Sequence, residues 1–467
     1  MGKFLSYYVM PHPPIIIPEI GKGEESAIKN TTEACDKIGR EIKDLKPDTI
    51  IIVTPHGPLF RDAIAVSSVK SLSGSFREFN APSVHFKLDL NVELTKSILG
   101  LSKENSIQTV EINDQSSRMY NIPLEIDHGS MVPLYFVTKH YTNFKLVHIT
   151  YGLLSKLELY KFGMLIKKAV CSSNSNAALI ASGDLSHRLK NDGPYKYNPA
   201  GKIFDDNITS LLNKQDVEGI FSLDENLIKN AGECGLRSFY IMLGAKDGIR
   251  TSSELLSYEG PFGVGYGVLK FKTEDGNGNS YYKSLESIEK NRMIKIRKDE
   301  DEYVKLARKS LEHYIKYGEY LTFPKNLPSE MINTKRGVFV SLHENGELRG
   351  CIGTIHPSYE NCGMEIIKNA VEAGENDSRF SPVKEDEFSS IEYSVDVLSE
   401  PEKASVKNLD PKTYGVIVRN GSRCGLLLPN LDGVDSVEEQ IKIALKKANI
   451  ETFEDYSIER FTVTRHL

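Results

Sequence analysis

The sequence predicts an α/β domain, with a mostly parallel sheet flanked by helices, followed by a smaller α+β domain. Over residues 1–272, short β-rich apolar runs alternate with longer helical patterns, which is typical of a parallel sheet covered on both faces. A polar, turn-rich stretch at residues 273–298 interrupts this alternation and predicts a linker. Residues 299–467 instead carry hairpin signals, so a separate domain with antiparallel pairing is predicted there.

The first domain is predicted to contain apolar strands separated by helices. Its run from Ile50 to Val53 is apolar throughout, as in a strand buried on both faces. A helix is predicted over residues 24–45, because apolar side chains such as Ile38 and Ile42 recur on one face. The strands are predicted at residues 4–10, 49–54, 64–69, 145–150, 177–182 and near 265–271.

The second domain is predicted to be built on two hairpins. Residues 344–346 read Glu-Asn-Gly and residues 420–421 read Asn-Gly, and both are strong turn signals between apolar runs. A short helix near 284–292 is predicted within the linker. The remaining elements are helices at 301–317 and 437–448 and strands at 337–343, 347–355, 391–398, 415–419 and 424–428.

Composition excludes several classes of protein. The 467 residues include 58 basic and 64 acidic side chains, and the net charge of −6 disfavours binding to nucleic-acid backbones. No apolar run approaches the roughly 18 residues that cross a bilayer, and no signal peptide is recognisable, so no membrane partner is expected. The six cysteines form no CxxC pair, which disfavours a disulfide framework or a structural zinc site. A cytoplasmic protein is therefore expected.

Three predicted strands of the first domain are each followed by a loop that carries a histidine. His12 and His56 both come directly after a proline, and His187 follows the strand at 177–182. Ligands bind open parallel sheets beyond the carboxyl ends of the strands, so these histidines are expected to converge. Proline stiffens the backbone, which suits a metal ligand. The alternative is that each histidine is an ordinary polar loop residue.

If His12 and His56 bind a metal, Glu233 is the first candidate for the third ligand. Two histidines and one carboxylate form the facial triad of non-haem Fe(II) oxygenases, which leaves positions open for substrate and O₂. Glu233 also lies in the first turn of a predicted helix, where an acid is favourable without any metal. The neighbouring Cys234 is an alternative, softer ligand and would favour copper or zinc.

His128 and His187 are candidate acid–base groups beside the metal. Imidazole titrates near neutral pH and is suited to proton transfer. His128 precedes a predicted apolar helix, as expected of a residue that lies at the end of a sheet. The other histidines of this domain, His85, His140 and His148, are interpreted as structural.

The motifs of the first domain, taken together, resemble a known family. In order they are His12, His56, Asp127-His128-Gly129, Asp184-Leu185-Ser186-His187 and Glu233. This order is similar to the class III extradiol ring-cleavage dioxygenases (LigB superfamily), especially their MEMO-like relatives, over residues 1–272. The resemblance implies that His12, His56 and Glu233 hold Fe(II), while His187 and His128 handle protons and oxygen. This ligand set departs from the MEMO-like pattern, in which the third ligand position is often a cysteine.

The second domain contains one candidate nucleophile, Cys351. Arg349 is expected to lower the pKa of its thiol, and both residues lie on one face of the predicted strand. A small buried cysteine more often serves packing, and that interpretation is preferred here.

The second domain also resembles a known family, the AMMECR-type domains. The matching segments are residues 349–353, 377–383 and 425–429, within a match over 299–467. Such domains occur with MEMO-like proteins and a radical SAM enzyme in the AmmeMemoRadiSam system. The resemblance therefore implies a radical SAM protein as a partner.

The sequence leads to two hypotheses about function. The first is an Fe(II)-dependent dioxygenase that cleaves a small catechol-like substrate with O₂. The second is a metal-binding scaffold or adaptor without turnover, which the cysteine beside Glu233 would suit.

Overall fold

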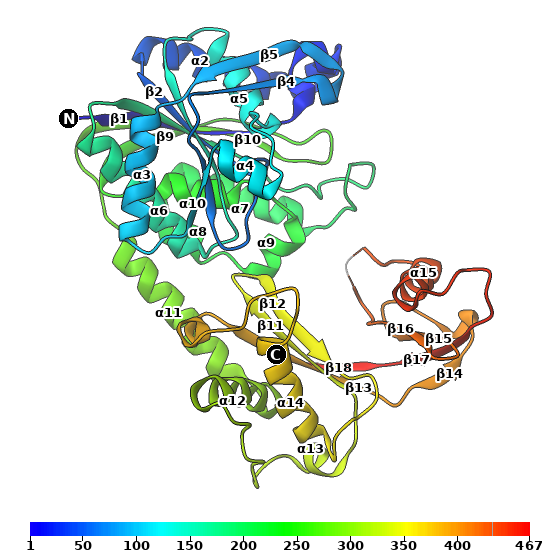
Figure 1. The fold of residues 1–467 in the computed structure, drawn as a ribbon. Coiled ribbons are helices and arrows are strands. Elements are labelled where there is room, and N and C mark those ends of the chain that lie inside the picture. The colour runs from blue at the N-terminus through cyan, green and yellow to red at the C-terminus, as the bar shows by residue number, and fades with distance from the viewer. Residues whose placement is uncertain (432) are drawn as a thin grey trace. The chain divides into compact units, whose positions relative to one another are not determined.

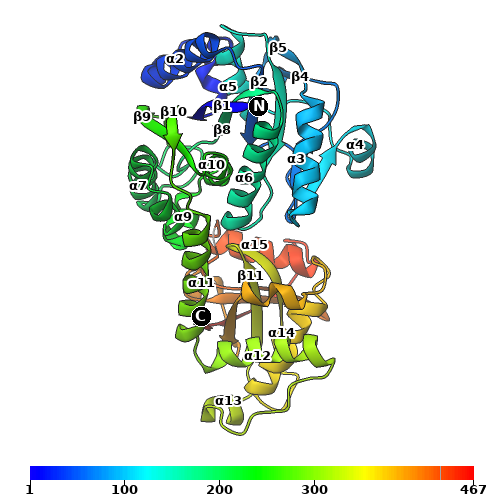
Figure 2. The ribbon, with the colours of Figure 1, turned by 90° about the vertical axis from the view of Figure 1, so that its left-hand side faces the viewer.

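The computed structural model describes residues 1–431 and 433–467, which form two compact units, residues 1–290 and 291–467. Figures 1 and 2 show the course of the chain. The strands of the first unit are β1 (Lys3–Met10), β2 (Thr49–Thr54), β3 (Ile64–Ser67), β4 (Ser71–Phe76), β5 (Ala81–Asp89), β6 (Thr109–Ile112), β7 (Lys145–Thr150), β8 (Asn176–Ser182), β9 (Ile249–Glu259) and β10 (Tyr266–Asn277). Its α-helices are α1 (Pro18–Gly21), α2 (Lys29–Leu45), α3 (Val92–Glu104), α4 (Asp114–Tyr120), α5 (His128–Thr138), α6 (Lys156–Ser172), α7 (Ala200–Lys214), α8 (Val217–Phe221), α9 (Glu225–Ala231) and α10 (Leu236–Ala245), and α11 (Tyr282–Asp299) begins in it.

The first unit is organised around an eight-stranded sheet with the order β6-β3-β7-β2-β8-β1-β10-β9. The four central strands β7, β2, β8 and β1 are parallel, while β3, β9 and β10 pair antiparallel to their inner neighbours. This confirms the prediction of a mostly parallel sheet. Because the central strands run the same way, the loops after β1, β2 and β8 all leave the sheet at one edge.

Helices cover both faces of this sheet and bury two apolar clusters. Helices α6 and α10 pack together on one face, and α2 and α5 pack together on the other, beside the β4–β5 hairpin (Figure 1). All six residues of β2 are buried, as its uninterrupted apolar run predicts. The predicted helix at 24–45 starts as a 3-10 turn, Glu24–Ile28, and continues as α2, whose buried face includes Ile38 and Ile42.

Some elements of the first unit have no counterpart among the predictions. The long strand β9 is mostly half-buried or exposed and rich in polar residues, so its apolar alternation is weak. The predicted linker 273–298 contains the end of β10 and most of the 18-residue helix α11, which is longer than the short helix predicted near 284–292. Its charged residues are good helix formers, and Leu285 is buried in the core of the first unit.

The second unit contains two four-stranded antiparallel sheets. The sheet β12-β11-β13-β18 packs against α12 and α14, and the sheet β14-β17-β15-β16 packs against α15. Both predicted hairpins are present, with the left-handed turn residues Asn345 and Gly421. The elements are α12 (Glu302–Tyr317), α13 (Ser329–Asn333), β11 (Val338–Glu344), β12 (Glu347–Gly353), α14 (Cys362–Glu375), β13 (Glu392–Leu398), β14 (Glu402–Ala404), β15 (Gly415–Asn420), β16 (Arg423–Leu427), α15 (Val437–Ala448), β17 (Ser457–Phe461) and β18 (Val463–His466).

Across the described residues, no helix has both the length and the apolar character needed to span a membrane.

Candidate metal centre

Three histidines of the first unit converge at the carboxyl edge of its sheet. One ligand nitrogen from each of His12, His56 and His128 lies within 4.8 Å of the other two. The Nε2 atoms of His12 and His56 are 3.0 Å apart, and the rings of His56 and His128 stack with centroids 4.1 Å apart. His12 follows β1, His56 follows β2 and His128 begins α5, so residues distant in sequence meet at one point.

Hydrogen bonds from the backbone N–H groups of His12 and His56 hold this group in place, and the His56 side chain leaves it open to solvent. His12 is 2% exposed, and its N–H donates to Asp184 Oδ1 at 2.8 Å. The His56 N–H donates to Thr54 Oγ1 at 3.2 Å, whereas the His56 side chain is exposed to solvent. The group is therefore anchored from inside the protein and accessible to a small molecule from outside.

The hydrogen bonds around His12 fix which ring nitrogen carries the proton. The Ser182 hydroxyl donates to the carbonyl oxygen of Gly129, and Ser182 Oγ also lies 3.0 Å from His12 Nδ1. Since a hydroxyl has one proton, Ser182 Oγ accepts from His12 Nδ1–H. The lone pair of His12 is then on Nε2, which points toward His56. In a metal-ligating histidine, the ring nitrogen that does not bind the metal usually donates its N–H to a hydrogen-bond partner, as His12 Nδ1 does here.

Burial lowers the pKa values of the three imidazoles and keeps them neutral. Burial, together with the nearby His128, lowers the pKa of His12 to about 3. The pKa of His56 is also lowered to about 3, by burial and by the neighbouring His12 and His128. Burial lowers the pKa of His128 as well. Neutral imidazoles are the form that binds a cation.

A buried carboxylate, Asp127, links the elements that carry His56 and His128. It caps the N-terminus of α5 by accepting the Ser130 N–H at 3.1 Å, and it accepts the Thr54 hydroxyl at 2.6 Å. Its Oδ2 lies 2.9 Å from Nε2 of the buried His148. Asp127 thereby connects β2, β7 and α5 through hydrogen bonds, next to His56 and His128. Sequence reasoning treated this aspartate only as part of a motif.

The structure separates the two candidates for the third ligand. Cys234 Sγ lies 3.7 Å from His12 Nε2 and accepts the Asp184 N–H at 3.3 Å. Glu233 Oε2 instead accepts the backbone N–H of Leu236 at 2.6 Å, in the first turn of α10. Cys234 therefore lies beside His12, whereas Glu233 occupies the helix-end position that was its alternative interpretation. Burial raises the pKa of both side chains.

A close crossing of two glycines places Cys234 beside His12. A Cβ on Gly183 would lie 2.1 Å from the Cα of Gly235, so the loops after β8 and before α10 touch backbone to backbone. Asp184, next to this crossing, bonds both His12 and Cys234. Burial raises the pKa of Asp184 to about 6. Sequence reasoning assigned Asp184 no role of its own, although it lies after a strand and begins the motif Asp184-Leu185-Ser186-His187.

His187 lies close to the imidazole group but outside it. Its ring stacks on Tyr195, with centroids 5.2 Å apart and planes at 16°. Burial lowers its pKa, and its charge contributes to the lowered pKa of His12 and His56. A neutral imidazole at this position is able to accept a proton.

The loop that carries His187 is held by the buried carboxyl of Asp205. Asp205 Oδ1 accepts the Ser186 N–H at 2.8 Å, and Oδ2 accepts the Tyr258 hydroxyl at 2.8 Å. Burial raises the pKa of Asp205 from 3.8 to about 7. The folded protein therefore binds a proton more tightly here than the unfolded chain, and this contribution to stability is complete below pH 4 and lost as the pH rises through 7.

We expect Asp205→Asn to remove this pH dependence while keeping the hydrogen bonds. The stability of the natural protein relative to the variant should fall by about 2–3 kcal/mol between pH 5 and pH 8. Urea unfolding of both proteins at the two pH values measures this difference. A difference that does not change with pH would contradict the assignment.

The candidate residues of the second unit do not form the predicted pair. Arg349 binds Glu387 through two hydrogen bonds, at 2.7 and 3.0 Å, rather than acting on Cys351. The pKa of Cys351 is raised by burial, with Ser341 and Arg379 lowering it in part. The expectation that Arg349 activates the thiol is therefore wrong, because the acid on a neighbouring 3-10 turn takes the guanidinium.

Comparison with known proteins gives the following matches. The family described as "Catalytic LigB subunit of aromatic ring-opening dioxygenase" matches residues 6–269, and the AMMECR1 family matches residues 304–466. Protein CA_C1420 of Clostridium acetobutylicum is 52% identical over 98% of this chain and 98% of its own length. A Thermotoga maritima protein is 48% identical over 36% of this chain and 98% of its own length. The crystal structure of the uncharacterized protein PH0010 from Pyrococcus horikoshii is 33% identical, with a TM-score of 0.33, over 35% of this chain and 88% of that one.

Proposed function

The chain belongs to the LigB family and carries an AMMECR1 domain after it, and from this we propose that its first unit is a non-haem Fe(II) dioxygenase that opens a catechol-like ring with O₂. The membership confirms both resemblances found in the sequence. The observation that carries the proposal is the convergence of His12, His56 and His128 within the matched region. They lie at the sheet edge where α/β proteins bind their ligands.

The imidazole geometry fits a metal ion. Two nitrogen ligands each about 2.1 Å from one ion lie about 3.0 to 3.4 Å apart, and the Nε2 atoms of His12 and His56 are 3.0 Å apart. The fixed proton on His12 Nδ1 leaves Nε2 free to bind. Both rings are neutral at physiological pH. These features support His12 and His56 as two of the ligands.

His128 is the third imidazole of the group, and between the two further candidates before α10 the geometry favours Cys234 over Glu233. A thiolate and an imidazole on one ion lie about 3.5 Å apart, close to the 3.7 Å between Cys234 Sγ and His12 Nε2. Glu233 would have to release the N-terminus of α10 before its carboxylate reached the group. Burial raises the thiol pKa, and a cation in the site would lower it.

The remaining residues bind substrate and move protons. Bound Fe(II) would supply the electrons that activate O₂ and would hold the two hydroxyl oxygens of the catechol. His187 accepts the proton of one substrate hydroxyl, and its stacking on Tyr195 fixes the plane of its ring. His128, held against His56 by stacking and against Phe79 edge to face, hydrogen-bonds the oxygen on which charge develops.

Oxygen uptake tests the proposal. We expect the full chain, loaded with Fe(II) under anaerobic conditions, to consume O₂ with at least one member of a catechol panel and to form an equal amount of ring-opened product. His187→Ala should lower the turnover rate by about 10²- to 10⁴-fold without loss of bound iron. An oxygen electrode, product absorbance and metal analysis provide the three readouts.

His140→Ala is the matched control, because His140 lies beyond the far end of α5 and pairs with Asp36. It should leave both turnover and iron unchanged. A protein that binds iron but consumes no O₂ with any catechol would contradict the dioxygenase proposal. It would instead support a metal-binding protein without turnover.

A further inference from the structure

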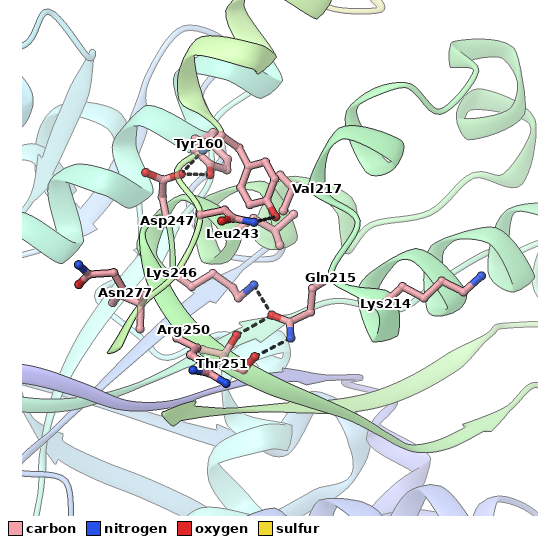
Figure 3. A pocket seen from close by; sticks show the side chains of 14 residues that line it. Tyr160, Lys214, Gln215, Val217, Leu243, Lys246, Asp247, Arg250, Thr251 and Asn277 are labelled. Atoms are coloured by element: carbon pink, nitrogen blue, oxygen red, sulfur yellow. Dashed lines mark hydrogen bonds between the residues drawn. The ribbon is translucent and has the colours of Figure 1, made fainter. Parts of the chain in front are cut away.

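A polar pocket lies at the end of the first unit's sheet opposite the imidazole group (Figure 3). Strand β10 runs antiparallel to β1, so its last residue, Asn277, is at the amino end of β1, far from His12. The pocket has a volume of about 370 Å³, within the range of small-molecule sites. Its walls come from the ends of α7, α10, β9 and β10 and from the segment before α11.

One wall of this pocket contains a buried lysine. Lys246 is 7% exposed, and its Nζ donates to Gln215 Oε1 at 2.9 Å. Its Nζ also lies 5.3 Å from the centre of the Phe271 ring. Among the described residues, Lys246 forms no ion pair, and the acid whose charge acts on it is the neighbouring Asp247. A buried cation without an acid partner is costly, and lysines are rarely buried in this way.

The residues around Lys246 are arranged to hold it in place. The Gln215 Nε2–H donates to the Thr251 carbonyl at 2.7 Å, and Gln215 Oε1 also accepts the Thr251 hydroxyl at 2.6 Å (Figure 3). The amide oxygen of Gln215 is therefore turned toward the ammonium. An ammonium has three N–H donors, and only one is used by Gln215. The others are available to a ligand.

The nearest acid, Asp247, is already occupied. Its carboxylate accepts the Tyr160 hydroxyl at 2.6 Å, the Tyr281 N–H at 2.7 Å and the Ser280 hydroxyl at 2.8 Å. It therefore fixes the start of the segment leading to α11 and makes no ion pair with Lys246.

The charges that line the pocket are predominantly positive. Lys214, Lys246 and Arg250 line it together with one acid, Asp247, although the net charge of the whole protein is −6. Arg250 pairs with Glu274 at 3.2 Å, and the Lys214 side chain extends away from the other labelled residues (Figure 3). Burial lowers the pKa of Lys246 to about 8, so the amine is still mostly protonated at pH 7. Lys246 is thus the principal uncompensated charge inside the pocket.

We propose that this pocket is a second ligand site, which binds a small carboxylate- or phosphate-bearing anion through Lys246. The oxyanion accepts the unused N–H groups of Lys246, and the body of the ligand lies against the side chains of Leu243 and Tyr281. The site is independent of the metal centre, because the two lie at opposite ends of the sheet.

Calorimetric titration of the full chain tests the proposal with two probes, inorganic phosphate and succinate. We expect at least one to bind with a stoichiometry of one, and the probe that binds identifies the oxyanion class. Lys246→Met should weaken that binding at least about tenfold, because it removes a charged hydrogen bond. Lys43→Ala removes an exposed lysine of α2 that does not line the pocket; it is the control and should change the affinity by less than about twofold. The proposal is overturned if neither probe binds or if Lys246→Met binds as tightly as the natural protein.

A measurement on the natural protein avoids any effect of substitution on folding. Limited acetylation with acetic anhydride, read by peptide mass spectrometry, reports the access to each amine. The bound probe should lower acetylation of Lys246 several-fold and leave that of Lys43, which does not line the pocket, unchanged. Equal acetylation of Lys246 with and without the probe would refute the site.

Discussion

Replacing His56 by alanine is expected to lower the affinity of the protein for Fe(II) by at least about 100-fold, since even the loss of an outer hydrogen-bond partner costs 10- to 100-fold. His56 supplies one of the two Nε2 atoms that lie 3.0 Å apart. Its side chain is exposed, so the substitution removes a ligand without opening a buried cavity. Metal content after dialysis and direct iron titration measure the effect.

The control for this prediction is again His140→Ala, which removes the same side chain elsewhere in the unit. Both variants should unfold at the same temperature as the natural protein to within a few degrees. Unchanged iron content in His56→Ala would refute the metal centre itself.

The same measurement identifies the third ligand. We expect Cys234→Ser to lose most of its bound metal and Glu233→Gln to retain it, because the amide oxygen of glutamine still accepts the Leu236 N–H. The reverse result would mean that the Glu233 carboxylate leaves the end of α10 to reach the ion. Metal identity in the purified protein adds a second readout: iron supports the proposed dioxygenase, whereas copper or zinc, which a thiolate ligand favours, would support the scaffold without turnover.

The second large effect is expected from Asp127→Ala, which should destabilise the first unit by about 3–5 kcal/mol. The substitution removes the acceptor of the Thr54 hydroxyl and the Ser130 N–H, and it leaves buried His148 without its 2.9 Å partner. Buried donors left unsatisfied lose their full solvation energy. Chemical denaturation, followed by a probe in the first unit, measures the loss.

The pH dependence of Asp127→Ala gives an independent check. Hydrogen bonds from His148 and other donors hold the pKa of Asp127 well below its usual range. A carboxyl with a lowered pKa in the folded state stabilises the protein above its unfolded pKa near 4, and this contribution is lost as the pH falls below that value. The difference between the two proteins should therefore shrink in acid. A constant difference from pH 7 to pH 3 would contradict this assignment.

The sequence predicted the part of the site that follows from topology. His12 and His56 come directly after buried parallel strands, so the direction of the strands alone brings them to one edge. The predicted hairpin at residues 344–346 is present for a similarly local reason, because Asn-Gly accepts the left-handed turn.

Choices between neighbouring side chains could not be predicted in this way. Glu233 and Cys234 are adjacent, and their directions depend on the contact between Gly183 and Gly235, which has no signal in a single sequence. Arg349 was likewise assigned to the wrong partner, because Glu387 is 38 residues away and reaches it only in the folded domain. Such pairings depend on tertiary distances rather than on local pattern.

The position of β1 in the sheet has a consequence for biosynthesis. β1 is translated before the other strands of its sheet, yet it lies between β8 and β10, and Cys234 follows His12 by 222 residues. A nascent chain on the ribosome thus carries His12 long before β1 can be enclosed, and such distant strand pairings form slowly. Under the proposed function, the complete set of side chains could capture a metal ion only late in maturation, after nearly the whole first unit has been made.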